Sequence, residues 1–270
     1  MKNNFFYIFV MFFFVACSHQ KEVVILSTND THSQVEPIVL LEDEGGYVSR
    51  LAIIDSIRQK EKDLLLLDAG DLFQGTPYFN FFGGRVEIEA YNRMGYDAIA
   101  LGNHEFDCPL DSLAERLKNA QFEVLCANYD VSGTVLEGIV KPYAIFEKNK
   151  SKIGVIGLGI NPKGLVLQTN YKGIEFLNPI KKANEIADFL RNKEHCDFVI
   201  VLSHLGSDYA DETISDVHVA SQSRNIDLII GGHTHKIVNK KVINLCGDSV
   251  LLVQSGKMGS FMNKTTLQKK

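Results

Sequence analysis

Leu101-Gly102-Asn103-His104-Glu105-Phe106-Asp107 is a short polar loop directly behind an apolar run, residues 97–101, that is typical of the end of a buried strand. In an open α/β sheet, ligands bind at the carboxyl ends of the strands, so side chains placed there converge on one crevice. The alternative is a helix-capping loop, with Asn103 or Asp107 as the N-cap and Pro109 in the first turn of a helix. The remaining sequence decides between the two interpretations.

Apolar runs of strand length alternate with amphipathic stretches of helical period along the chain. The predicted strands are residues 22–28, 64–68, 97–101, 122–127, 197–202 and 226–230, with a hairpin over 143–156 that turns at 148–151. The predicted helices follow Gly45-Gly46 and begin near Arg85, Pro109 and Asn178-Pro179. The terminal Lys269-Lys270 and the polar residues before them are expected to form a frayed end. This alternation predicts the α/β class.

Composition limits the function classes. A chain of 270 residues with 45% hydrophobic content can bury a core in one large domain or two small ones. Its formal charge of -5 argues against a basic nucleic-acid-binding surface, so no nucleic-acid binding is expected. Four cysteines follow the N-terminal segment, and their spacing and apolar neighbours suit buried thiols as well as disulfides. No bridges are assigned among Cys108, Cys126, Cys196 and Cys246.

Residues 1–16 are predicted to be a signal peptide. Lys2 precedes an apolar run from Phe5 to Ala16, which is shorter than the roughly 20 residues needed to span a bilayer. The small residues before Cys17 resemble the lipobox of bacterial lipoproteins, although Phe14 stands where that box usually has Leu. We therefore expect export to the periplasm or cell surface and attachment to the membrane through a lipid on Cys17. An ordinary signal peptide cut nearby is the alternative.

Five of the eight histidines lie directly after predicted strands, as do two aspartates and one asparagine. They are His32, His104, His204, His233, His235, Asp30, Asp71 and Asn103. Any one of them could be a hydrogen-bonded loop residue, but packing so many polar groups together is costly without a counter-charge. Carboxylate, imidazole and amide groups are ligands of divalent ions such as Zn, Mn, Fe or Mg. Eight groups exceed the needs of one ion and suit about two.

The order of the polar blocks resembles the calcineurin-like metallophosphoesterases. The blocks are Asp30-x-His32, Gly70-Asp71, Gly102-Asn103-His104-Glu105, Ser203-His204 and Gly231-Gly232-His233-x-His235. Their extended forms, such as DAGDLFQGTP and ALGNHEFD, resemble the catalytic domain of the periplasmic 5′-nucleotidase family from about Val23 to Gly256. The resemblance implies a four-layer α-β-β-α sandwich with two mixed sheets, formed by residues 17–270 as a single catalytic domain.

The resemblance also implies roles for the clustered residues. One divalent ion would be held by Asp30, His32, Asp71 and His235, and a second by Asp71 as a bridge, Asn103, His204 and His233. His104 and Asp107 would be the catalytic pair that binds no metal. The family often carries Gln or Asn where His235 stands, which leaves the choice among Zn, Mn, Fe, Co and Mg open.

The implied chemistry is hydrolysis of a phosphomonoester. Two cations roughly 3.5–4 Å apart lower the pKa of a bridging water and clamp the phosphoryl oxygens for in-line displacement. Asp107 would orient His104, whose imidazolium stabilises charge on the phosphoryl group and protonates the leaving alkoxide. The expected substrate is a phosphorylated small molecule, a nucleoside 5′-monophosphate by resemblance.

Full-length family members carry a C-terminal domain that recognises the base, and this domain is absent from the sequence as we interpret it. The chain could therefore be the catalytic subunit of a split 5′-nucleotidase that needs a separate C-terminal domain. A 2′,3′-cyclic phosphodiesterase, a UDP-sugar hydrolase, a thiosulfate-ester hydrolase, a general phosphatase and a binding lipoprotein without turnover also stay open. Phe79, Phe81 and Phe82 are interpreted as a capping or interface patch in preference to a ligand platform.

Overall fold

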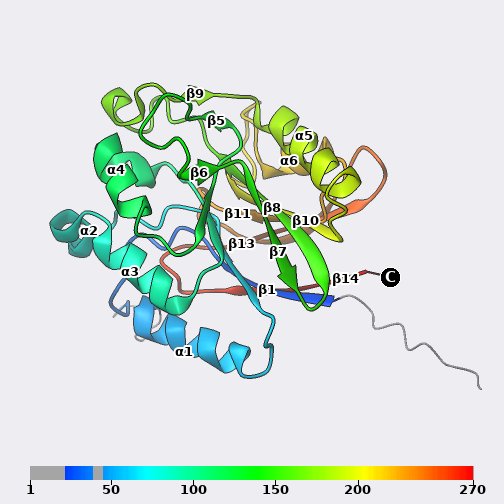
Figure 1. Cartoon of the computed structure of the whole chain (residues 1–270), viewed down its shortest axis with the longest axis horizontal. Coiled ribbons are helices and arrows are strands. Elements are labelled where there is room, and N and C mark those ends of the chain that lie inside the picture. The colour runs from blue at the N-terminus through cyan, green and yellow to red at the C-terminus, as the bar shows by residue number, and fades with distance from the viewer. Residues whose placement is uncertain (1–21, 39–44, 270) are drawn as a thin grey trace, which may run out of the picture.

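Two six-stranded mixed sheets lie face to face, with helices on both outer faces (Figure 1). This computed structural model describes residues 22–38 and 45–269. The four-layer α-β-β-α sandwich that the family resemblance implied is confirmed. The predicted signal peptide, residues 1–16, and Cys17 lie outside the described residues. Among the described helices, none has both the length and the apolar character needed to cross a membrane.

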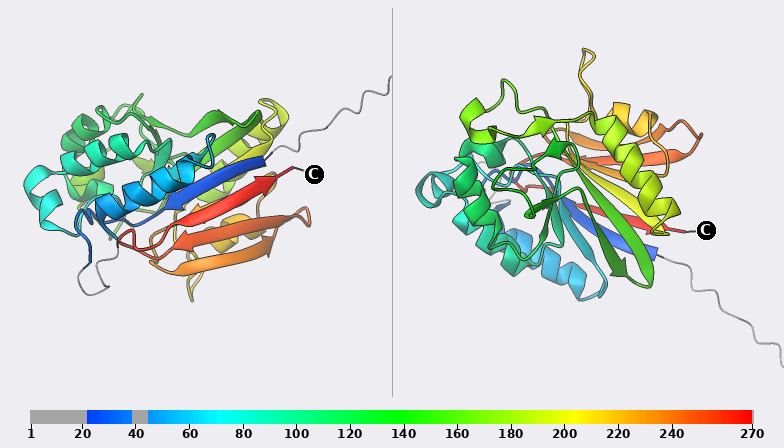
Figure 2. Two further views of the ribbon diagram at one scale, coloured as in Figure 1. Left: turned by 90° about the horizontal axis from the view of Figure 1, so that it is seen from below. Right: turned by 45° about the horizontal axis from the view of Figure 1, so that its top comes forward.

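The first sheet has the order β14-β1-β2-β3-β4-β6. Its strands are β1 Glu22–Thr28, β2 Leu65–Asp68, β3 Ala98–Ala100, β4 Glu123–Leu125, β6 Val140–Lys141 and β14 Asn263–Gln268. The strands from β1 to β6 are parallel, and β14 runs antiparallel to β1 at the edge (Figure 2). The prediction of a frayed end was wrong for β14, because backbone pairing with β1 forms this strand although its side chains are mostly polar.

The second sheet has the order β12-β13-β11-β10-β8-β7. Its strands are β7 Tyr143–Lys148, β8 Ser151–Gly159, β10 Phe198–His204, β11 Leu228–Gly231, β12 Ile237–Ile243 and β13 Ser249–Ser255. The predicted β7–β8 hairpin is present, and its turn residues Asn149 and Lys150 both have positive φ, as a two-residue turn of type I′ requires. A small separate sheet pairs β5 Tyr129–Asp130 with β9 Glu175–Phe176.

Helices cover the outer face of each sheet (Figure 1). The chain order of the helices is α1 Gly46–Arg58, α2 Pro77–Phe82, α3 Arg85–Met94, α4 Leu110–Leu117, α5 Pro179–Asn192 and α6 Asp216–Ser221. Helices α1, α3 and α4 pack on the first sheet, whereas α5 and α6 pack on the second. The α5 helix begins as its sequence predicts, because Asn178 Oδ1 accepts the Lys181 amide at 2.9 Å. Within residues 22–38 and 45–269, two short 3-10 helices, His104–Asp107 and Gln168–Tyr171, lie in the loops.

Three buried apolar clusters fill the spaces between the four layers of the sandwich. The alternation of side chains along each strand decides which cluster a residue joins. In β1, Val23 and Ile25 point between the sheets, and Val24 and Leu26 point toward the helices. The two sheets are in close contact where β8 crosses β4. A Cβ at Gly157 would lie 2.2 Å from the Leu125 carbonyl oxygen, so only glycine fits there. This close packing fixes the relative position of the two sheets and of the loops at their ends.

Candidate metal centre

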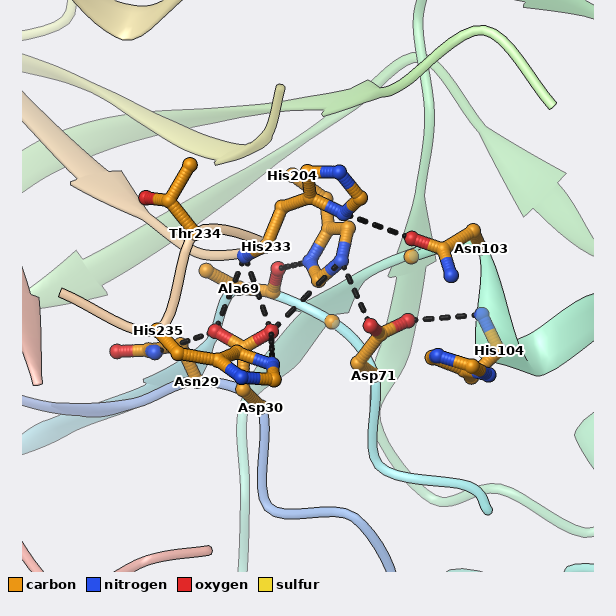
Figure 3. Close-up of polar contacts among 12 residues, drawn as sticks. Asn29, Asp30, Ala69, Asp71, Asn103, His104, His204, His233, Thr234 and His235 are labelled. Carbon is orange, nitrogen blue, oxygen red and sulfur yellow. Dashed lines mark hydrogen bonds and ion pairs between the residues drawn. The ribbon is translucent and has the colours of Figure 1, made fainter. Parts of the chain in front are cut away.

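The predicted ligands follow the carboxyl ends of strands in both sheets (Figure 3). Asp30 and His32 follow β1, Asp71 follows β2, and Asn103 and His104 follow β3. His204 ends β10, and His233 and His235 follow β11. The sequence interpretation expected them at the carboxyl ends of strands that converge on one crevice. In the structure the edges of two sheets share the site, because the sandwich brings both sets of strand ends together.

Three groups of side chains bring possible ligand atoms within 4.8 Å of one another. They are Asp30, His32 and His235; His32, Asp71 and His104; and Asp71, His204 and His233. The first and third groups correspond to the two predicted ion sites. The second group connects them through His32 and Asp71 and includes His104.

The buried His204 ring shows why a cation fits this centre. Its Nδ1 lies 2.7 Å from the Ala69 carbonyl oxygen, so Nδ1 carries a proton and donates it. Its Nε2 lies 2.9 Å from Asp71 Oδ2 and 3.8 Å from Asp30 Oδ1. A neutral ring would direct a lone pair at two carboxylates, so a proton or a metal ion is needed between them. Burial lowers the pKa of His204, but the Asp71 carboxylate outweighs it and raises that pKa to about 10.

His32 and His235 present a similar pairing of acceptor atoms. Their Nε2 atoms are 2.9 Å apart, and His235 Nε2 lies 3.4 Å from Asp30 Oδ1. Burial lowers the pKa of His32 despite the nearby carboxylates. A neutral imidazole is the form that binds metal, and carboxylate with imidazole is a ligand set for borderline divalent ions. These three side chains therefore fit one ion.

Asp71 lies at the centre of the site. Its Oδ1 accepts the His104 amide at 2.8 Å, and its Oδ2 faces His204. Burial acts to raise the pKa of Asp71, but the surrounding histidines, led by His204, hold it below its usual value. On the far side, His233 Nδ1 lies 2.8 Å from Asn103 Oδ1, and burial and His204 lower the pKa of His233 to about 4. Asp71, Asn103, His204 and His233 therefore fit a second ion.

His104 and Asp107 form a pair beside the predicted ligands. His104 Nδ1 lies 2.6 Å from Asp107 Oδ2. Burial lowers the pKa of His104, but the Asp107 hydrogen bond and nearby carboxylates raise it overall. The capping alternative for this loop is wrong, because α4 begins at Leu110 without a side-chain cap, and Asn103 and Asp107 both bond to histidines.

The backbone of the ligand loops adopts conformations that non-glycine residues rarely show. Five predicted ligands have φ in the left-handed region, with values of 50, 47, 58, 69 and 55 for Asp30, His32, Asp71, His233 and His235. Such conformations cost about 1–3 kcal/mol each and concentrate at functional sites. Gly102 adds a close approach, since a Cβ there would lie 2.2 Å from Asp71 Oδ1. The unusual backbone conformation of these loops therefore determines where the predicted ligand side chains lie.

Glu105 is a functional residue that the sequence analysis left without a role. Its buried carboxylate accepts the amides of Gly102 at 2.6 Å, Leu72 at 2.9 Å and Asp71 at 3.1 Å. It thus fastens the β2 loop to the β3 loop. Burial raises the pKa of Glu105 to about 7, with Asp71 acting in the same direction. The sequence places an acid here but carries no signal that distinguishes it from Asp107.

The aromatic residues of α2 divide between core and surface. Phe79 packs on Phe73, with ring centroids 5.5 Å apart. Phe81 is 82% exposed and Phe82 is 40% exposed. Phe81 and Phe82 therefore offer the most exposed apolar surface of this helix to a partner.

Fold and ligand set together define a metallophosphatase-like protein, and comparison with known proteins agrees. The model of the calcineurin-like phosphoesterases matches residues 23–237. The chain belongs to this family of hydrolases. It is 35% identical over 229 residues to the snake venom 5′-nucleotidase of Crotalus adamanteus, and this match covers 79% of this chain and 37% of that protein. With UshA of Yersinia enterocolitica it shares 33% identity over 79% of this chain and 41% of the relative.

Solved structures show the same relationship. A 5′-nucleotidase precursor from Thermus thermophilus superposes with a TM-score of 0.82 at 32% identity, covering 91% of this chain and 51% of that one. The NAD nucleotidase of Haemophilus influenzae superposes with a TM-score of 0.81 at 27% identity, covering 92% and 47%. The chain thus spans about half the length, or less, of these relatives.

Proposed function

We propose that this chain hydrolyses phosphomonoesters at a centre of two divalent metal ions, with nucleoside 5′-monophosphates as the substrate class. One observation carries the proposal: the ligand groups Asp30-His32-His235 and Asp71-His204-His233 are adjacent, since Asp71 also has a carboxylate oxygen within 4.8 Å of His32. Burial of Asp30, Asp71 and His204 supports it, because buried charges at this density need counter-charges.

Bound ions would supply an activated hydroxide and Lewis-acid stabilisation of the phosphoryl oxygens. The chain's own groups do the rest. His104 is held by Asp107 with its Nδ1 engaged, which leaves Nε2 to face a substrate. Since its pKa is raised, His104 is available as an imidazolium that stabilises phosphoryl charge and gives its proton to the leaving alkoxide. Glu105 holds the Asp71 and Gly102 backbone so that His104 keeps its place beside Asp71.

Metal analysis combined with a phosphate-release panel tests this proposal. We expect the chain without residues 1–17 to bind about two equivalents of transition metal and to release phosphate from 4-nitrophenyl phosphate and from nucleoside monophosphates. A chelator should abolish release, and added Mn²⁺, Co²⁺ or Zn²⁺ should restore it. Metal-free protein with full turnover would contradict the proposal.

Nucleotide specificity is proposed from the relatives alone, since two are named 5′-nucleotidases and the chain spans only part of each. We propose that base recognition comes from a separate domain, which makes the chain the catalytic part of a larger or split enzyme. A 2′,3′-cyclic phosphodiesterase or a UDP-sugar hydrolase would use the same metal ligands. Including cyclic nucleotides and UDP-sugars in the phosphate-release panel distinguishes these activities.

Export and lipid anchoring at Cys17 belong to the same proposal. The support is the short apolar run of residues 5–16 and the small residues before Cys17. Cys17→Ser should move the protein from the membrane fraction to the soluble fraction or block its maturation. An unchanged membrane fraction without an acyl mass on Cys17 would refute the anchor.

A further inference from the structure

A buried polar network lies under the loops that carry the predicted ligands, on the helix side of the first sheet. Its centre is Asp68, the last residue of β2, whose side chain is fully buried. Asp68 Oδ2 accepts the Thr28 hydroxyl at 2.6 Å and the Tyr91 hydroxyl at 2.9 Å. Asp68 Oδ1 accepts the Gly70 amide at 2.8 Å. One carboxylate therefore holds groups from β1, from the β2 loop and from α3.

Two further hydroxyls extend the network. The Tyr96 hydroxyl lies 2.7 Å from Thr28 Oγ1, and the Thr31 hydroxyl lies 2.7 Å from the Tyr91 oxygen. Each hydroxyl has a single proton, and those of Thr28 and Tyr91 are donated to Asp68. Tyr96 must therefore donate to Thr28, and Thr31 to Tyr91. Every proton in the network is directed toward Asp68, an arrangement in which successive hydrogen bonds reinforce one another.

The charges around the network favour this arrangement. Burial raises the pKa of Asp68, while its three donors and the nearby Arg50 guanidinium act against that rise. Arg50 comes from α1, is almost fully buried, and lies with its guanidinium carbon 5.2 Å from the centroid of the Tyr47 ring. Burial raises the pKa of Tyr96 to about 12, and that of Tyr91 also rises, so both hydroxyls keep their protons.

Two residues of the network are direct neighbours in sequence of the predicted metal ligands. Thr31 stands between Asp30 and His32, and Gly70 immediately precedes Asp71. Asp68 thus reaches the β1 loop through Tyr91 and Thr31, and reaches the β2 loop directly. These two loops supply the carboxylates of both candidate ion sites, and both loops have left-handed backbone at their ligands.

We propose that Asp68 and Tyr91 are positioning residues that set the distance between the β1 and β2 ligand loops and thereby the affinity of the centre for metal. This inference rests on the proposed metal ligands. Neither residue touches the predicted substrate position, so both act through Asp30, His32 and Asp71. The hydroxyl of Tyr91 is the connection that can be removed with least disturbance, because phenylalanine keeps the ring and its stacking on Tyr96.

Zinc binding by the full chain tests the proposal. We compare wild type, Tyr91→Phe and Asp68→Asn by Zn²⁺ competition against a chromophoric chelator, and measure thermal unfolding with all metal removed. Tyr129→Phe is the matched control, since its buried hydroxyl donates to the Ile160 carbonyl and reaches neither ligand loop. Outer residues that orient ligands change metal affinity by roughly 10–100-fold. We expect Tyr91→Phe to weaken Zn²⁺ binding about tenfold, Asp68→Asn to weaken it further, and Tyr129→Phe to leave it unchanged.

The unfolding midpoints separate positioning from plain stabilisation. Tyr91→Phe and Tyr129→Phe each lose one buried hydroxyl, so their metal-free midpoints should fall by similar amounts, and saturating Zn²⁺ should return Tyr91→Phe to near wild-type kcat. Wild-type Zn²⁺ affinity in Tyr91→Phe, or equal weakening in Tyr129→Phe, would overturn the proposal. If wild type binds none of Zn²⁺, Mn²⁺ and Co²⁺, the proposed function itself fails. Tyr91→Phe decides the question if Asp68→Asn does not fold.

Discussion

Asp71 is the residue on which both candidate ion sites depend. It belongs to two of the three ligand groups, and its two oxygens face opposite neighbours, the His104 amide and His204. It holds a left-handed φ of 58°, and Gly102 leaves the space that its carboxylate occupies. A single side chain therefore couples the two halves of the centre, whereas His235 belongs to one half and is partly exposed.

Replacing Asp71 should remove both metal ions. We expect Asp71→Ala to bind less than about half an equivalent of metal, because the bridging ligand is lost together with the counter-charge for His204. His235→Ala should keep about one equivalent, since its loss affects the Asp30-His32-His235 group alone. Metal content after dialysis, measured by mass spectrometry, checks both expectations. Full metal content in Asp71→Ala would refute its role as a bridge.

His104 should affect rate without affecting metal content. His104→Ala should lower kcat for an aryl phosphate by about 10²–10⁴-fold, the usual contribution of a general acid, while metal content stays at wild-type level. Asp107→Asn should cost less, since it only misorients the ring. Loss of metal in His104→Ala would instead identify it as a ligand, which the His32-Asp71-His104 group allows on distance alone.

The His204–Asp71 pair predicts how stability of the metal-free protein depends on pH. The folded pKa of His204 is about 10, above its usual value of 6.5. A raised pKa means that the stabilisation is fully present below about pH 6.5 and is lost as the pH rises toward 10. With metal removed, the unfolding midpoint should therefore fall between pH 7 and pH 10. Bound metal should reduce the slope, because the ion replaces the proton.

A substitution isolates this pH effect. His204→Gln should abolish most of the fall in midpoint, whereas His195→Asn, at an exposed histidine that is not one of the predicted ligands, should keep it. A slope that is unchanged in His204→Gln would mean that other groups cause it.

At the scale of elements, the contact between β8 and β4 holds the two sets of ligand loops together. Gly157 faces the first sheet and meets the Leu125 backbone, whereas Gly154 on the same strand faces α5 and meets the end of the Leu190 side chain. A side chain can rotate away, but the backbone of a paired strand cannot. Both glycines thus leave little space for a Cβ atom, but an added methyl group would be tolerated better at Gly154 than at Gly157.

We expect Gly157→Ala to lower the free energy of unfolding by about 3 kcal/mol and Gly154→Ala by about 1 kcal/mol, the range that overpacking of a core produces. Urea unfolding of the metal-free proteins measures both. Metal affinity should fall only in Gly157→Ala, because separation of the sheets moves His204 away from Asp71. Equal losses of stability in both variants would contradict the assigned difference.

Sequence reasoning predicted many elements whose packing depends on their side-chain pattern, although it missed the apolar strand β13. The apolar run before His204 and the Asn178-Pro179 helix start are examples, and the strand-end position of each predicted ligand follows from them. It did not predict β14, because residues such as Lys264 and Thr266 have no apolar alternation and the strand depends on backbone pairing with β1. It also gave no role to Glu105 or Asp68, since their function lies in contacts with residues distant in sequence.

For the whole molecule, the predicted ligands all lie within residues 23–237, which the family model matches. The resemblance predicts that base recognition belongs to a further domain, and α2 offers the exposed Phe81 and Phe82 as candidate contacts for it. In the proposed mechanism the metal ions and His104 would act on the phosphoryl group, so they would contribute equally to every phosphomonoester. Binding that is uniform across substrates gives little discrimination.

The chain alone should therefore hydrolyse 4-nitrophenyl phosphate and the common nucleoside monophosphates with kcat/KM values within about tenfold of one another, because no base contact separates them. A second domain supplied in trans should raise kcat/KM for a nucleoside monophosphate far more than for the aryl phosphate, since only the nucleotide gains contacts. Phe81→Ser combined with Phe82→Ser should weaken that response without changing the basal rate, and His104→Ala controls for contaminating phosphatase. A hundredfold preference of the lone chain for one nucleotide would place the specificity site within these 270 residues.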